Sequence, residues 1–292
     1  MEMAHPTRRL LVDVVWVAIV NATAALALLF GFFPDGPSIA RADTLKEIDS
    51  PRPGVKLRML VEKGEQPKAA VILLPGALGL VKIGTFFGSA APGKELENNF
   101  LVRTRKDLVK RGFMTVVVDT PSDKASGMPP AFRMSQMHVQ DLTAIVHYLK
   151  QEYGLPVWVA GTSRGTISAA RLLVENLPEL AGGILTSSIV QSDEKWATFK
   201  THPDVLLNMP LERVSLPVLV IHHKDDSCEE CPPQKADRLH NKFPKSRQFE
   251  FVWIEGGSPP KSDPCDALAY HGFYGQEDRA LDAMAGFIKA NK

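Results

Sequence analysis

The sequence lacks a marked charge imbalance, a long run of one charge sign, an internal repeat and a long low-complexity tract. Its 292 residues carry a formal net charge of +1, so charge gives no reason to expect a nucleic-acid partner. Only three cysteines are present, too few for a disulfide-built scaffold. What remains is 45% hydrophobic content in a chain of ordinary domain length, which predicts one globular domain with a large core.

The first 42 residues differ from the rest of the chain. Arg8-Arg9 begins an apolar run, Leu10–Phe33, and the segment ends in Ala40–Ala42. A basic start, an apolar stretch and a small-x-small end are typical of a secretory signal peptide, with Asp43 as the expected mature N-terminus. The run is also long enough to span a bilayer, so an uncleaved membrane anchor is the alternative. Either interpretation exports the domain over 43–292, to the periplasm or the exterior, and restricts membrane contact to this leader.

From about residue 55, strand-like and helix-like segments alternate. Runs that are apolar on both faces, such as 69–74 and 113–118, are typical of strands in a parallel sheet covered by helices on both faces. The sequence therefore predicts an α/β fold with a mostly parallel central sheet. The carboxyl ends of its strands meet at one edge, where ligands bind. The expected strands are 55–61, 69–74, 113–118, 157–160, 183–186, 218–221 and 248–254, and the expected helices are 95–111, 134–152, 163–176, 232–242 and 276–290.

The strongest motif is Gly161-Thr162-Ser163-Arg164-Gly165. It directly follows the expected strand 157–160 and opens a helix, which is the context of a G-x-S-x-G nucleophile elbow. The glycines allow a tight, strained turn between strand and helix. Ser163 then projects at a helix N-terminus, where partial positive charge favours a developing oxyanion. Ser163 is therefore the candidate nucleophile.

A nucleophilic serine needs a base, and the base needs an acid that orients it. The strand 218–221 ends in His222-His223-Lys224-Asp225-Asp226, which places an acid at the correct edge of the sheet. Asp226 is the preferred acid; Asp225 is the nearer alternative and Asp193 a more distant one. His271 is the candidate base, because it follows the last strand and precedes the closing helix.

The two histidines beside the acid have another expected role. His222 and His223 are expected to line the site or to hydrogen-bond its loop. A metal site made of these two residues and Asp226 would lack a recognisable ligand spacing, so no metal is expected.

Residues from about 55 to the end resemble the α/β-hydrolase superfamily, in its dienelactone-hydrolase-like and esterase-like branch without a large cap domain. The resemblance rests on the elbow 161–165, on the stretch 222–226 where the family has H-G-x-x-D, and on His271. His223 replaces the glycine of that pattern. The resemblance implies a carboxylic ester hydrolase with a Ser-His-Asp triad, acting on a small-molecule ester and needing no cofactor.

The resemblance also indicates an oxyanion hole. Residues Pro75–Gly79 stand where many members carry His-Gly-Gly or His-Gly. By position, the backbone N–H groups of Ala77 and Arg164 would stabilise the oxyanion, with Leu78 as the alternative to Ala77.

Substrate preference is less clearly indicated. Phe86, Phe87, Met128 and Met134 either line an apolar acyl pocket or pack beneath a loop. The Arg164 side chain either binds an anionic group of a substrate or packs over its helix. A thioesterase or peptidase would use the same triad, and a non-catalytic binding protein on a hydrolase fold is the alternative from another class. The sequence does not indicate an oligomeric state.

The cysteines lie close to the candidate acid and base in sequence. Cys228 follows Asp226, and Cys265 precedes His271. If the two loops meet, a Cys228–Cys265 disulfide would join them, which an oxidising compartment permits. A Cys231–Cys265 pair is the alternative.

Overall fold

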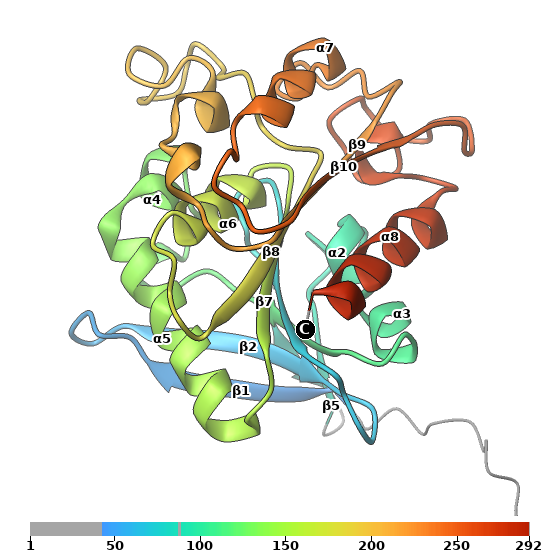
Figure 1. The fold of residues 1–292 in the computed structure, drawn as a ribbon. Helices are drawn as coiled ribbons and strands as arrows, with labels where there is room; N and C mark the ends of the chain where they lie inside the picture. Colours follow the sequence, from blue (N-terminus) through green and yellow to red (C-terminus); the bar gives the residue numbers. More distant parts are fainter. Residues whose placement is uncertain (1–42, 87–88, 292) are drawn as a thin grey trace, which may run out of the picture. The chain divides into compact units, whose positions relative to one another are not determined.

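The computed structural model describes residues 43–86 and 89–291. They form an eight-stranded sheet in the order β1-β2-β6-β3-β7-β8-β9-β10, with helices on both faces (Figure 1). The leader predicted over residues 1–42 lies outside the described residues. Within the described ranges, no helix combines the length and the hydrophobicity that a membrane crossing requires.

Six neighbouring strands, from β6 to β10 in the sheet order, run parallel, and β2 pairs antiparallel with both β1 and β6. The predicted mostly parallel sheet is therefore confirmed. Two further short strands, β4 and β5, form a separate hairpin. The strands are β1 (Thr44–Asp49), β2 (Lys56–Glu62), β3 (Ala70–Leu74), β4 (Gly84–Phe86), β5 (Ser89–Ala91), β6 (Met114–Val118), β7 (Val157–Thr162), β8 (Leu180–Thr186), β9 (Val218–His223) and β10 (Phe249–Ile254).

Helices cover the sheet in two layers, each with its own apolar cluster. One cluster packs α5 (Gln136–Tyr153) and α6 (Gly165–Leu173) against one face, near α4 (Pro130–Met134). The other packs α2 (Phe100–Arg103), α3 (Arg105–Lys110) and α8 (Glu277–Ala290) against the opposite face. Figure 1 shows these two groups on opposite sides of the strands. Each fully buried aliphatic side chain contributes roughly 1.5–3 kcal/mol to this packing.

Two predicted helices are shorter than the sequence suggested. The segment 95–111 divides into α2 and α3 at Thr104, whose hydroxyl donates to the carbonyl of Phe100 at 2.6 Å. A side chain that bonds the backbone in this way competes with helix continuation. The segment 232–242 forms only α7 (Pro233–Ala236), followed by the 3-10 turn η4 (Asp237–Asn241). The other 3-10 turns are η1 (Ser122–Lys124), η2 (Val205–Asn208), η3 (Leu211–Arg213) and η5 (Tyr270–Gly272).

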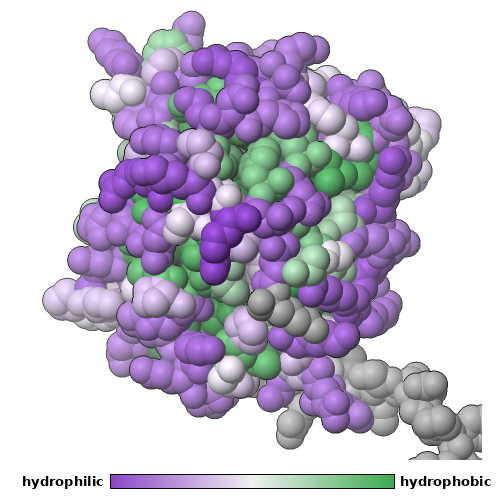
Figure 2. Space-filling view, in the orientation of Figure 1, coloured by the Kyte–Doolittle hydropathy of each residue, from purple (hydrophilic) through white to green (hydrophobic). Residues whose placement is uncertain are grey.

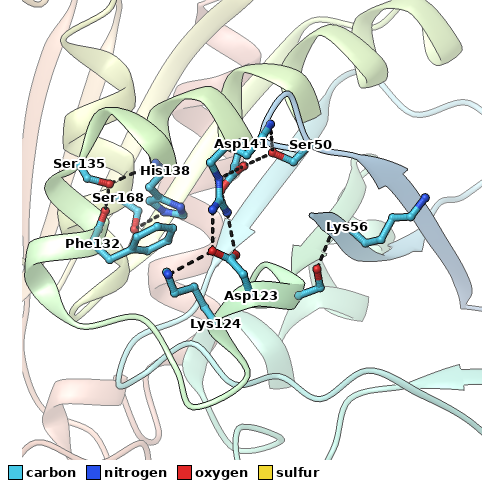
Figure 3. Close-up of polar contacts among 11 residues, drawn as sticks. Ser50, Lys56, Asp123, Lys124, Phe132, Ser135, His138, Asp141 and Ser168 are labelled. Atoms are coloured by element: carbon cyan, nitrogen blue, oxygen red, sulfur yellow. Dashed lines mark hydrogen bonds and ion pairs between the residues drawn. The ribbon is translucent and has the colours of Figure 1, made fainter. Parts of the chain in front are cut away.

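A polar cluster fastens the turn between β1 and β2 to α5 (Figure 3). The Arg52 guanidinium bridges the carboxylates of Asp123 and Asp141. Hydrogen bonding from Arg52 lowers the pKa of Asp123 to about 2. Ser135, the N-cap of α5, accepts from the backbone N–H of His138, which satisfies one of the free amides at the start of this helix.

The surface around this core is mainly polar. Figure 2 shows hydrophilic side chains over most of the face in view, with smaller apolar areas between them. Among the described residues, the large hydrophobic side chains that are exposed are Leu78 and Met137. The exposed Leu78 lies in the turn that follows β3, at the sheet edge where the candidate site is built.

Candidate active site

Ser163 occupies the sharp turn between β7 and α6 with a φ of +52°, a conformation that costs a non-glycine residue energy. A Cβ on Gly161 would lie 2.5 Å from the carbonyl oxygen of Gly165, and a Cβ on Gly165 would lie 2.0 Å from that of Leu74. Only glycine fits at either position. The elbow therefore has the strand–turn–helix geometry that the motif predicted, with the serine at the N-terminus of α6.

Backbone hydrogen bonds hold this strained turn in place. The N–H of Ser163 donates to the carbonyl of Thr186 on the neighbouring strand β8, at 3.1 Å. The Ser163 carbonyl accepts from both the N–H and the hydroxyl of Thr166, at 2.9 and 2.6 Å. Both backbone groups of Ser163 are therefore hydrogen-bonded, the N–H to β8 and the carbonyl to α6.

Asp226 and His271 lie together, as the sequence suggested. His271 Nδ1 and Asp226 Oδ2 are 2.9 Å apart, and both side chains are buried. The other carboxylate oxygen of Asp226 accepts from the N–H of Cys228 at 3.0 Å. Asp225, the nearer alternative acid, leaves 63% of its side chain exposed. Of these two neighbouring acids, the structure therefore pairs Asp226 with the imidazole.

The second imidazole nitrogen of His271 is left unpaired within the described ranges. His271 Nε2 is buried and has no hydrogen-bond partner among the described residues. Ser163 and His271 both line one cavity of about 340 Å³. His271 thus combines a ring nitrogen that can still accept a proton with a place in the lining of the cavity that Ser163 also lines.

Several residues hold the loop that carries His271. The Ser187 hydroxyl donates to the carbonyl of His271 at 2.7 Å. Arg103 donates to the carbonyls of Ala267 and Gly272, at 3.2 and 2.6 Å. Sequence reasoning missed Ser187 and Arg103, because hydrogen bonds to distant backbone carbonyls leave no motif. These three hydrogen bonds hold the backbone of the loop that carries the candidate base.

His222 and His223, at the end of β9, bond two different loops. His222 Nε2 accepts from the N–H of Ser188 at 2.6 Å, and burial lowers the pKa of His222 to about 4, so the ring is neutral. His223 donates to the Gly256 carbonyl at 2.8 Å and accepts from the N–H of Asp225 at 3.1 Å. His223 therefore bonds the acid loop, as expected, whereas His222 bonds the segment that follows β8.

The turn over residues 75–79, named here the oxyanion turn, lies directly against Ser163. A Cβ on Gly76 would come within 2.7 Å of the Ser163 Cβ, so glycine alone permits this approach. The next residue, Ala77, has a φ of +47°. The backbone hydrogen bonds of the described residues include none donated by Ala77 or Arg164, which leaves both amides free for an oxyanion. Ala77 lines the cavity together with Ser163.

The side chain of Arg164 is already engaged. Its guanidinium forms an ion pair with Glu230 and lies 4.8 Å from the centre of the Trp196 ring. Both partners lie outside α6, so these contacts show neither of the two roles that the sequence left open. Of the candidate pocket residues, Met128 is buried against the oxyanion turn and Met134 packs against the core. The side chains of Phe86 and Phe87 lie outside the described part of the chain.

A disulfide joins the acid and base loops. Cys228 and Cys265 are bonded, with their Cα atoms 4.5 Å apart. This is the pairing that the sequence favoured over Cys231–Cys265. Cys231 is a buried free thiol that donates to the carbonyl of Ser187 at 3.3 Å. The pair Asp226 and His271 is thus linked covalently as well as by hydrogen bonding.

A second, larger cavity of about 850 Å³ adjoins the first at Cys265. Its lining combines acidic side chains with the residues that follow β8. Within it Asp204 forms an ion pair with Lys235, and Glu230 pairs with Arg164.

Solved structures show what this architecture is similar to. A cold-adapted esterase from an Arctic intertidal metagenomic library aligns with a TM-score of 0.54 and 15% identity, over 86% of this chain and 97% of that one. An α/β serine hydrolase homologue from Coxiella burnetii aligns with a TM-score of 0.53 and 18% identity, over 85% and 98%. A serine hydrolase without a lid from Xanthomonas campestris gives 0.54 and 15%, also over 85% and 98%. No protein-family model and no curated protein sequence matches the chain.

These likenesses, at identities below 25%, establish the fold alone. The described domain has the α/β-hydrolase fold, in the form found in esterases and lidless serine hydrolases. The predicted fold and the predicted resemblance are therefore confirmed.

Proposed function

We propose that the protein is a serine hydrolase that cleaves small carboxylic esters through an acyl-enzyme, with Ser163, His271 and Asp226 as its triad. The observation that carries the proposal is the buried Asp226–His271 hydrogen bond of 2.9 Å, formed by a histidine that lines the same cavity as Ser163. His138 and His222, which are also buried, likewise leave one ring nitrogen unpaired among the described residues, so the hydrogen bond to a buried carboxylate is what distinguishes His271.

The proposed reaction begins when Ser163 Oγ attacks the ester carbonyl while His271 Nε2 takes its proton. Asp226 keeps the other nitrogen protonated and stabilises the imidazolium that forms. His271 then gives the proton to the leaving alkoxide, so an alcohol departs and the acyl group stays on Ser163. Water then attacks the acyl carbon while His271 takes its proton, and His271 returns that proton to Ser163 Oγ as the acyl–oxygen bond breaks and the carboxylic acid leaves.

The amides of Ala77 and Arg164 are the proposed donors to the oxyanion. Each such donor contributes roughly 3–4 kcal/mol of transition-state stabilisation when it is well placed. Gly76 supports this assignment, because its close approach to Ser163 brings the next amide to the reacting centre.

We also propose that the protein works outside the cytoplasm, with residues 1–42 as a cleaved signal or an uncleaved anchor. The Cys228–Cys265 bond supports this, because disulfides persist mainly in oxidising compartments. N-terminal sequencing of the protein, purified from a host that can export it, tests whether the leader is cleaved. A chain that begins at Asp43 is expected, and an intact leader in the membrane fraction would indicate the anchor.

A panel of p-nitrophenyl esters of increasing acyl length, with a thioester and a peptide amide for comparison, tests the activity. Turnover is expected to be fastest for short esters, because the cavity at Ser163 holds about 340 Å³. Faster cleavage of the thioester or the amide would redirect the proposal to a thioesterase or a peptidase. No turnover of any of them would favour a binding protein.

A further inference from the structure

Arg133, on α4, is buried to 1% exposure and has no acidic partner among the described residues. Burial lowers its pKa to about 9, so the guanidinium still carries its charge at neutral pH. A buried charge without a counter-ion is costly unless hydrogen bonds compensate it. The hydrogen bonds of Arg133 all lead to the region around Ser163.

The Arg133 guanidinium hydrogen-bonds the backbone of the oxyanion turn. One terminal nitrogen of Arg133, Nη2, donates to the carbonyls of Pro75 and Ala77, at 3.2 and 3.3 Å. These carbonyls flank the Gly76–Ala77 peptide bond, which carries the proposed oxyanion donor, the N–H of Ala77. One side chain thus restrains the backbone on both sides of that amide.

The conformation of the turn explains why such a restraint is needed. Ala77 has a φ of +47°, which a non-glycine residue keeps only when its surroundings enforce it. One backbone hydrogen bond within the turn helps to hold this conformation. The N–H of Gly79 donates to the carbonyl of Gly76 at 3.0 Å. A Cβ on Gly79 would lie 2.8 Å from Arg133 Nη2, so glycine also makes room for the guanidinium.

The same guanidinium is itself held by the helix that follows the nucleophile. Arg133 Nη1 donates to the hydroxyl of Ser168, on α6, at 3.0 Å. His138 Nε2 lies 2.9 Å from that hydroxyl (Figure 3). Burial, together with the charges of Arg133 and Arg52, lowers the pKa of His138 to about 3, so its ring is neutral and accepts from Ser168. The chain His138–Ser168–Arg133 therefore connects α5, α6 and the oxyanion turn.

We propose that Arg133 is a positioning residue that holds the oxyanion turn in the left-handed conformation at Ala77, and that its unpaired charge favours the oxyanion. The consequence for catalysis rests on the proposed function; the consequence for the turn does not. Arg133 touches no reacting atom, so it acts through the Ala77 amide.

The test compares Arg133→Met and Arg133→Lys with Arg105→Met. Arg105 is a largely buried arginine that pairs with Asp43 and Glu62 and is not among the residues that line the cavity at Ser163. For Arg133→Met, kcat for p-nitrophenyl acetate is expected to fall by at least about tenfold with KM nearly unchanged, because a misplaced amide weakens only transition-state binding. Arg133→Lys keeps the charge and is expected to recover part of the loss. If the Met variant does not fold, the Lys variant carries the test.

Amide hydrogen exchange over residues 76–79 provides a readout that needs no activity. Exchange there is expected to quicken in Arg133→Met and to stay unchanged in Arg105→Met. Unchanged exchange in folded Arg133→Met would overturn the proposal. So would an equal loss of kcat in Arg105→Met, if the two variants have the same Tm. A wild-type protein without esterase activity would instead refute the proposed function, and the exchange measurement would then decide the role of Arg133 alone.

Discussion

The imidazole of His271 and the carboxylate of Asp226 share a buried hydrogen bond of 2.9 Å across 45 residues of sequence. The carboxylate cannot turn away, because its second oxygen accepts from the N–H of Cys228. The proton between the two side chains therefore belongs on Nδ1, which leaves Nε2 as an acceptor. This pair fixes the tautomer that a base beside Ser163 requires.

The first prediction compares the two neighbouring acids. Asp226→Asn is expected to reduce kcat for ester hydrolysis by about 10³–10⁴, because the amide favours the wrong tautomer of His271. Asp225→Asn is the matched control, since Asp225 is mostly exposed and does not contact the imidazole; its kcat is expected to change by less than about twofold. Steady-state kinetics on both variants measures the difference, and equal losses would contradict the assignment of the acid.

The second prediction concerns the disulfide. The double variant Cys228→Ser/Cys265→Ser is expected to lose about 4 kcal/mol of unfolding free energy, from the chain-entropy cost of a loop whose ends are 37 residues apart. Cys231→Ser is the control, because serine still donates to the carbonyl of Ser187 and no cross-link is lost. Urea unfolding under non-reducing conditions measures both; a double variant as stable as the control would contradict a structural disulfide.

The third prediction concerns pH. Glu62 ends β2 at the edge of the sheet away from the site, and burial together with the Asp43 carboxylate raises its pKa to about 7. Arg105 and Lys106 also face it, at 3.6 and 3.9 Å. In the unfolded chain Glu62 loses its proton near pH 4.5, whereas in the folded chain it keeps this proton up to about pH 7. The contribution of Glu62 to the unfolding free energy therefore falls as pH rises from 4.5 toward 7.

Glu62→Gln is therefore expected to lessen the loss of unfolding free energy between pH 5 and pH 8, by on the order of 2 kcal/mol. Glu65→Gln, at an exposed position nearby, is expected to leave the pH dependence unchanged. Urea unfolding of wild type and both variants at the two pH values measures this. A wild-type dependence that Glu62→Gln leaves intact would contradict the raised pKa.

Apolar patterning was sufficient to predict the central strands, because a strand buried on both faces, such as β3, is nearly all aliphatic. It missed β1, whose sequence TLKEID is half-exposed at the sheet edge and carries no apolar run. It also overextended the helix at 95–111, because the hydrogen bond from Thr104 to the Phe100 carbonyl leaves no periodic signal.

In the candidate site, too, some residues could be predicted from the sequence and others could not. Ser163 could be predicted because steric limits at Gly161 and Gly165 dictate a recognisable motif. Arg133 could not, because its role depends on carbonyls of Pro75 and Ala77 that lie 58 and 56 residues away. Residues that act by their own chemistry are visible in a sequence, whereas those that act by position become visible only in the fold.

The central claim is that Ser163 is an activated nucleophile, and a fluorophosphonate probe tests it most directly. Intact-mass and peptide mass spectrometry of the folded protein should show one adduct per chain, on Ser163, that is absent from Ser163→Ala and much slower to form in His271→Ala. Labelling at another residue, or no labelling of the folded wild-type protein, would contradict the account.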